Sequence, residues 1–265
     1  MSLLHKEQVV VSGSIATDII AKLPDNRNDT SLLDYFPELP PQLSVSLLVD
    51  NLQRFRGGTG ANIARTMAML GQQPFLLASI GKEDLGYLQE LEQLGVMTQH
   101  VHLSELMTSL FFVVTDKLNN QVAAFGSSAM GDPEANLSLI PWKDENALVI
   151  ISPHDPEKMH AQIRECTQFG IPYCFDIGQQ VNNTSKEFLI QGVQNTTVLV
   201  ANAHEMQRLS SITGVSSEQI KNNTPLYITT YGKDGAIIEG TEIDTPIQIP
   251  AARVQRVVDP TGAGD

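Results

Sequence analysis

Cysteines, basic residues and long apolar runs are all scarce in this chain. Only Cys166 and Cys174 occur among its 265 residues, without C-x-x-C spacing, which argues against a zinc site and favours reduced thiols in a core. Lys and Arg number 17 against 30 Asp and Glu, a formal charge of -13, and no basic run is present. Such a composition argues against a surface that binds nucleic acid by neutralising its phosphates.

No apolar stretch approaches the roughly eighteen residues of a membrane span, and the N-terminus lacks a basic segment followed by a full apolar run. We therefore expect a soluble, cytoplasmic protein without a nucleic-acid or membrane partner.

The composition that remains, 42% apolar and 18% charged, is that of a globular protein. Short runs rich in Val, Ile and Leu alternate with amphipathic stretches, which indicates an α/β fold with a mainly parallel sheet covered by helices on both faces. The predicted strands are Val9–Val11, Pro74–Ile80, Leu148–Ser152, Tyr173–Asp176, Val198–Val200 and Leu226–Thr229. The predicted helices are Ala61–Leu70, Asp84–Leu94, Pro156–Phe169 and Ala203–Leu209.

Two further segments, Ser44–Phe55 and Leu110–Phe125, have the pattern of strands, and Asn119-Asn120 is a hairpin signal within the second. They predict a small antiparallel lid, from about 40–56 and 108–126, inserted in one domain that spans 1–265.

The sequence closes on Asp259-Pro260-Thr261-Gly262-Ala263-Gly264-Asp265. Its two glycines let the backbone approach an anion closely at the start of a helix, so the backbone N–H groups from Gly262 to Asp265, those of Ala263 and Gly264 included, can stabilise a transferring phosphoryl group. Asp265 would lie beside that group and accept the proton of an attacking hydroxyl. An Asp-Pro turn before a glycine-rich terminus is the alternative interpretation.

Two other clusters suit a sugar-like ligand. In Arg56-Gly57-Gly58-Thr59-Gly60-Ala61-Asn62, the first two glycines can hinge a lid or let a ligand touch the main chain, and Asn62 can both donate and accept. A helix cap explains this cluster equally well. Asp18 follows the first strand, and its carboxylate suits two adjacent ribose hydroxyls, although an Asp in a surface turn is common.

Taken together, these clusters resemble the ribokinase/PfkB family of carbohydrate and nucleoside kinases. The order of the motifs is the same: a substrate Asp, Gly-Gly-x-x-x-Asn, Asn-x-x-Glu at Asn202-Ala203-His204-Glu205, and the closing glycine-rich motif. The resemblance implies that Asn202 and Glu205 help place Mg²⁺ and ATP through water, whereas a helix N-cap is the plain alternative. It also implies that Thr230 and Gly232 contact ATP.

Within the family, the chain looks most similar to ribokinase-like bacterial adenosine kinases. That likeness implies that Ser14, Asp18, Ser46, Gly58 and Asn62 hold the ribose. Phe111 and Phe125 would then flank the base, and Gln179 and Gln180 would bond to base or ribose. The alternatives are that Phe111 and Phe125 belong to the core of the lid, and that Gln179 and Gln180 lie in a solvated loop.

The resemblance further implies a three-layer α/β/α fold, a homodimer through lid strands, and residues that follow the catalytic Asp and belong to the same domain. A sugar kinase of the ribokinase or fructokinase type and a catalytically silent nucleoside-binding protein remain open.

Overall fold

A computed structural model of the chain describes residues 8–24, 32, 46–118, 120–134, 147–254 and 264. Its largest element is an eight-stranded sheet in the order β14-β13-β12-β11-β10-β9-β1-β4. The strands are β1 (Gln8–Ser12), β4 (Phe75–Leu77), β9 (Ala147–Ile151), β10 (Tyr173–Asp176), β11 (Val198–Asn202), β12 (Leu226–Thr230), β13 (Ala236–Glu239) and β14 (Ile247–Ile249). The pairs from β4 to β12 are parallel, and β13 and β14 add antiparallel strands at one edge.

All six strands predicted for this sheet are present. The predicted strand Pro74–Ile80 is divided at Ala78 into β4 and β5 (Ser79–Gly81), and β5 pairs with β6 (His102–Ser104) in a separate two-stranded sheet.

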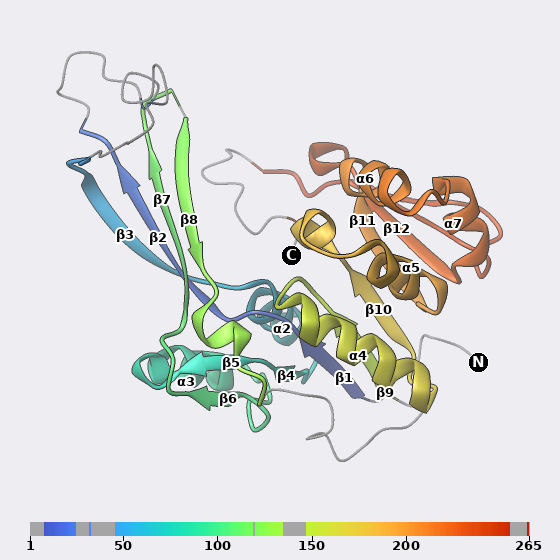
Figure 1. The fold of residues 1–265 in the computed structure, drawn as a ribbon, viewed down its shortest axis with the longest axis horizontal. Helices are drawn as coiled ribbons and strands as arrows, with labels where there is room; N and C mark the ends of the chain where they lie inside the picture. Colours follow the sequence, from blue (N-terminus) through green and yellow to red (C-terminus); the bar gives the residue numbers. More distant parts are fainter. Residues whose placement is uncertain are drawn as a thin grey trace.

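A four-stranded sheet projects from the body of the molecule (Figure 1). Its strands, in spatial order, are β3 (Asp50–Gly57), β2 (Ala16–Lys22), β7 (Ser109–Thr115) and β8 (Gln121–Gly126). The outer pairs are antiparallel, but β2 and β7 run parallel, so the expectation of an antiparallel sheet was wrong at its centre. These two strands are far apart in the sequence, and a long crossover connection permits a parallel pair where a tight hairpin would not. Of the predicted hairpin signal, Asn119 lies outside the described residues.

Helices cover both faces of the large sheet. The helices are α2 (Thr59–Met69), α3 (Leu85–Gln93), α4 (Pro156–Phe169), α5 (Lys186–Gln194), α6 (Ala203–Thr213) and α7 (Ser217–Asn223). One core cluster joins β1, β4 and β5 to α2 and α3, and the other joins β9 to β12 to α4 through α7. In the described part of the chain, no helix is long and apolar enough to cross a membrane.

The helix boundaries follow from local signals in the sequence. The Asp155 side chain accepts from the amide of Lys158, Pro156 occupies the first turn, and Gly170 ends α4 in a left-handed conformation. Helices α5 and α7 were not predicted, yet Ser185 and Ser216 cap them in the same way. Both helices are short, so their apolar periodicity is weak compared with their caps.

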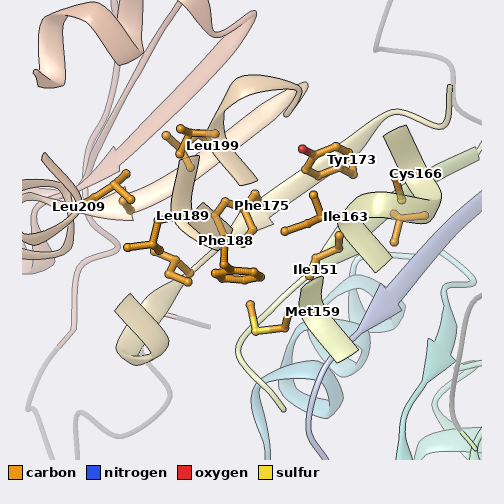
Figure 2. Packing of buried hydrophobic residues seen from close by; sticks show 14 of the residues in the cluster. Ile151, Met159, Ile163, Cys166, Tyr173, Phe175, Phe188, Leu189, Leu199 and Leu209 are labelled. Atoms are coloured by element: carbon orange, nitrogen blue, oxygen red, sulfur yellow. The ribbon is translucent and has the colours of Figure 1, made fainter. Parts of the chain in front are cut away.

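The larger core cluster lies between β9, β10 and β11 and the helices α4 to α6 (Figure 2). Phe175 and Phe188 pack edge to face, with ring centroids 5.8 Å apart. Cys166 and Cys174 are buried free thiols, as predicted, and burial raises the pKa of Cys174 far above its ordinary value. This core fixes the central strands, and therefore the loops at their carboxyl ends.

Candidate active site

The carboxyl ends of β1 and β9 form the centre of the candidate site. The chain passes from β1 to β4 on one side, whereas β9 lies on the other side of β1. Strand order thus reverses at β1, and open parallel sheets bind ligands in the crevice outside such a reversal. The Ser152 amide donates to the carbonyl of Ser12 at 2.9 Å, so the two strand ends lie side by side.

A hydroxyl network ties three loops together at this point. The amide of Thr59, the first residue of α2, donates to Ser14 Oγ at 3.1 Å. The Thr59 hydroxyl donates to the carbonyl of Pro153 at 2.7 Å, in the loop after β9. The amide of Ala61 donates to the Ser14 carbonyl. Ser14 therefore joins the turn after β1 to the start of α2, and its hydroxyl is already engaged in this network.

Glycines allow these loops to approach each other closely. A Cβ added to Gly58 would lie 2.5 Å from the Ser14 carbonyl oxygen and 2.6 Å from the Ala16 amide nitrogen. Gly58 also has a φ of 96°, which residues with a Cβ rarely adopt. A Cβ on Gly57 would lie 2.3 Å from Asp18 Oδ2. Gly58 is required by this packing, whereas a Cβ on Gly57 would meet only the movable end of the Asp18 side chain. The use of the two glycines as a hinge stays a prediction.

Substitution of Gly58 should destabilise the protein, because the added side chain disrupts this packing. We expect Gly58→Ala to lower the free energy of unfolding by about 3 kcal/mol or more, because backbone strain and a main-chain clash add. Gly71→Ala is the matched control, since Gly71 has a φ of 86° but no atom within 4 Å of an added Cβ. It should lose only about 1 kcal/mol in urea unfolding. Equal losses for the two variants would contradict the close approach.

Asp18 lies in β2, a strand that begins directly after the turn at 13–15. The sequence predicts that Asp18 follows the first strand at the carboxyl end of the sheet, and it did not indicate that a second strand begins there. The turn is shorter than expected, and the alternation in Ala16–Lys22 was obscured by the polar Thr17 and Asp18. The carboxylate still lies next to the crevice, because Gly57, its close neighbour, immediately precedes the Gly58 turn.

A row of four side chains crosses one face of the small sheet. Asp18 pairs with Phe55 on β3 and with Phe111 on β7, and Phe111 pairs with Phe125 on β8. Directly paired residues share a face, so the row is Phe55, Asp18, Phe111 and Phe125. Phe55 and Phe125 are 45% and 51% exposed, which shows that the row is not closed off as a core. Phe55 was not predicted, although its position on a strand beside two glycines was the available signal.

His154 follows β9, and Gln180 lies in the short helix Gly178–Asn182 that follows β10. His154 Nδ1 lies 2.7 Å from the Ser152 carbonyl, and burial lowers the pKa of the imidazole to about 4, so the ring is neutral near pH 7. Gln180 donates from Nε2 to the His154 carbonyl at 2.8 Å, which fixes the loop that carries Pro153. Gln179 is exposed. Of the predicted pair, only Gln180 has a defined bond to this loop.

A second group lies at the carboxyl ends of β11 and β12. Asn202 Oδ1 accepts from the Glu205 amide, and Glu205 Oε2 accepts from the Asn202 amide, both at 2.8 Å, which forms a capping box on α6. Thr230 pairs with Asn202 across the strands, and Gly232 follows with a φ of 57°. The structure therefore brings Asn202, Glu205 and Thr230 together. It also shows that Asn202 is the N-cap of α6, which was the alternative interpretation of this motif.

The remaining predicted residues are less closely connected. Asn62 is half-buried in the first turn of α2, beside Gly58. Ser46 is exposed and precedes β3, whose outer residue Asp50 pairs with Lys22, so Ser46 is not gathered next to Asp18. Gly262, Ala263 and Asp265 lie outside the described residues, and Gly264 is exposed.

Mg²⁺ prefers oxygen ligands, and Asn202 and Glu205 supply them. The capping box engages Oδ1 of Asn202 and Oε2 of Glu205, an arrangement that suits contact through water better than direct coordination. Within the described ranges, no group of three or more His, Cys, Asp and Glu side chains could hold a metal ion.

The family described as pfkB family carbohydrate kinase matches residues 6–265. A nucleoside kinase of Methanocaldococcus jannaschii is 29% identical over 88% of this chain and 77% of its own length. A nucleoside kinase of Methanothermobacter thermautotrophicus is 30% identical over 88% of this chain and 74% of its own length. The structure of Burkholderia thailandensis nucleoside kinase in complex with inosine superposes with a TM-score of 0.80 at 29% identity, over 97% of this chain and 80% of that one.

Proposed function

Because the chain belongs to the PfkB family of carbohydrate kinases, we propose that it transfers the γ-phosphoryl group of ATP to the 5′-hydroxyl of a nucleoside. The resemblance to this family and the ribokinase-like α/β fold are both confirmed. The observation that carries the substrate class is the row on the small sheet, where a carboxylate stands between the exposed ring of Phe55 and the half-buried ring of Phe111. Such a row offers acceptors to vicinal hydroxyls and flat apolar surfaces to a base.

Adenosine is the nucleoside that we propose, with AMP as the product. The motifs at Ser14 and Asp18 and the aromatic pair Phe111 and Phe125 support this choice through their likeness to the bacterial adenosine kinases. Relatives named for other substrates define the competitors to be tested, since a guanosine-inosine kinase and a ribokinase are 24% and 26% identical to the chain.

In the proposed mechanism, Asp18 and Asn62 hold the ribose 2′- and 3′-hydroxyls, while Gly58 lets the sugar approach the main chain. Asp265 accepts the proton of the 5′-hydroxyl as it attacks in line. The backbone N–H groups from Gly262 to Asp265 stabilise the charge on the transferring group. Asn202 and Glu205 would place Mg²⁺ and the triphosphate through water, where the metal would supply charge neutralisation, and Thr230 and Gly232 would contact ATP. Closure of the small sheet as a lid would exclude water from the reaction.

A thermal-shift panel in the presence of Mg²⁺ and a non-hydrolysable ATP analogue tests the substrate class. Adenosine, inosine, guanosine and cytidine are compared with ribose and fructose, and a ligand at a hundred times its Kd adds about 2.7 kcal/mol of stability. Stabilisation by ribose and by no nucleoside would favour the sugar-kinase alternative. An ATP-consumption assay of the full chain separates the enzyme from a silent binding protein.

The aromatic residues should discriminate between a nucleoside and a free sugar. We expect Phe111→Ala and Phe125→Ala to raise the KM for the nucleoside at least about tenfold and that for ribose by less than about twofold, since only the base loses a stacking surface. Phe169→Ala is the matched control, because Phe169 is also 51% exposed but lies at the end of α4. Equal effects on both ligands would show that the two rings serve the sheet and not the base.

A homodimer that pairs small sheets is part of the proposal. β3 and β8 are the edge strands of this sheet, and the described residues of β8 are all exposed. Exposed strand edges offer unpaired backbone groups to a second copy. Sedimentation equilibrium of the purified protein measures whether such a dimer forms.

A further inference from the structure

A buried carboxylate lies behind the small sheet, on the side away from the row. Asp84, at the end of the short turn Lys82–Asp84, is only 4% exposed. Its Oδ2 accepts from Thr17 Oγ1 at 3.0 Å and from Arg54 Nη2 at 2.8 Å, and its Oδ1 accepts from Arg56 Nη1 at 2.6 Å. The three donors come from β2 and β3, so a single side chain of the main body holds the base of the small sheet.

The alternation of a strand places this anchor directly behind the substrate face. Successive side chains in β2 point to opposite faces, so Thr17 faces Asp84 and Asp18 faces the row. Thr17 pairs with Arg56, and Asp18 pairs with Phe55. The position of the Asp18 carboxylate therefore depends on the backbone that the Thr17 hydroxyl holds.

Tyr87 supplies a second hold on the same backbone. Its hydroxyl donates to the Gly57 carbonyl at 3.0 Å, and the Arg56 guanidinium lies 4.7 Å from the centre of its ring. Gly57 in turn lies against the Asp18 carboxylate. Asp18 is thus fixed from two sides, through Thr17 on its own strand and through Gly57 on β3.

Charge explains why this anchor is firm. Burial would raise the pKa of Asp84, but hydrogen bonds from Arg56 and Thr17 and the charges of Arg56 and Arg54 lower it below the ordinary range. A depressed carboxyl pKa contributes stability above the unfolded pKa and loses it as the pH falls through the folded value. Asp84 is therefore ionised, and the anchor intact, throughout the neutral range.

We propose that Asp84 is a positioning residue for the nucleoside site, acting through the Thr17 hydroxyl to hold Asp18 in place for the ribose. This inference rests on the proposed function, because it assigns Asp18 to the sugar. Under this proposal, neither Asp84 nor Thr17 contacts the substrate or takes part in proton transfer. Their loss should weaken nucleoside binding while ATP binding and the chemical step change less.

Two substitutions of Thr17 test the proposal without leaving Asp84 unpaired, because both arginines remain. Thr17→Val keeps the shape and removes the hydroxyl, and Thr17→Ser keeps the hydroxyl. By isothermal titration we expect Val to weaken adenosine binding at least about fivefold and Ser to stay within about twofold. The Kd of the ATP analogue should stay within about twofold in both variants. Asp84→Asn should show the same pattern more strongly, and Glu239→Gln, in the distant pair with Lys221, should show none of it.

The outcomes separate this inference from the proposed function. If the unmodified protein binds adenosine and Thr17→Val binds it equally well, or loses adenosine and ATP affinity alike, the positioning role is wrong. If the unmodified protein binds no nucleoside and no sugar, the proposed function fails. In that case, hydrogen exchange of the unliganded proteins tests the anchor by itself. Faster exchange of the amides at 16–22 in Thr17→Val, but not in Thr17→Ser, would support the anchor. Unchanged exchange in Thr17→Val would overturn it.

Discussion

Replacing Asp265 with asparagine should lower turnover at least about a hundredfold while adenosine binding stays within about threefold of that of the unmodified protein. The amide preserves the size of the side chain but cannot accept the proton of the 5′-hydroxyl as an ionised carboxylate does. Steady-state kinetics of the full chain give kcat, and isothermal titration gives the Kd of adenosine.

The matched control is Asp244→Asn, an acid-to-amide change in an exposed loop between β13 and β14. It should leave both quantities unchanged. Turnover of the Asp265 variant near that of the control would remove this residue from the role of base and return the glycine-rich ending to a simple turn.

Replacing Asp18 with asparagine should have the opposite kinetic pattern. We expect the KM for adenosine to rise about a hundredfold, because an amide cannot accept from two hydroxyls with a full negative charge, and each hydrogen bond to a charged group contributes roughly 1.5–3 kcal/mol. The KM for ATP should change little. Steady-state kinetics with each substrate varied in turn measure the two effects.

A rise in both KM values would indicate damage to the fold instead of a lost contact with ribose. The urea unfolding curve of the Asp18 variant provides the check, and Asp244→Asn is again the control. If the Asp18 variant bound free ribose normally and lost only the contact with the base, Asp18 would lie elsewhere in the site.

Much of the main fold could be predicted because its elements carry strong periodic or capping signals. The buried strands around Val10 and Val149 read as short apolar runs, and α4 begins and ends at the residues predicted. β2 was missed because its residues are mixed in character, and its neighbour β7 is supplied by a distant part of the chain. Pairing of that kind is decided by tertiary packing and leaves no local pattern.

The site divides in the same way. Some site residues can be recognised in the sequence. Gly58 is one, because paired glycines indicate an unusual backbone conformation, and Asp18 is another, because its carboxylate has a distinctive chemistry. Phe55 and Asp84 cannot be recognised in this way, because an aromatic residue in a strand and an acid near a helix are both common. Their importance depends on registers and contacts that only the folded chain brings together.

The parallel pairing of β2 with β7 also governs when the site can form. Ala16 is opposite Ser109, and Gln8, at the start of β1, is opposite Ala147. Contacts between residues so far apart in sequence are slow to form, and during synthesis the partner strands leave the ribosome much later than Asp18 does. The strand that carries Asp18 therefore cannot complete its pairing until the middle of the chain has been synthesised.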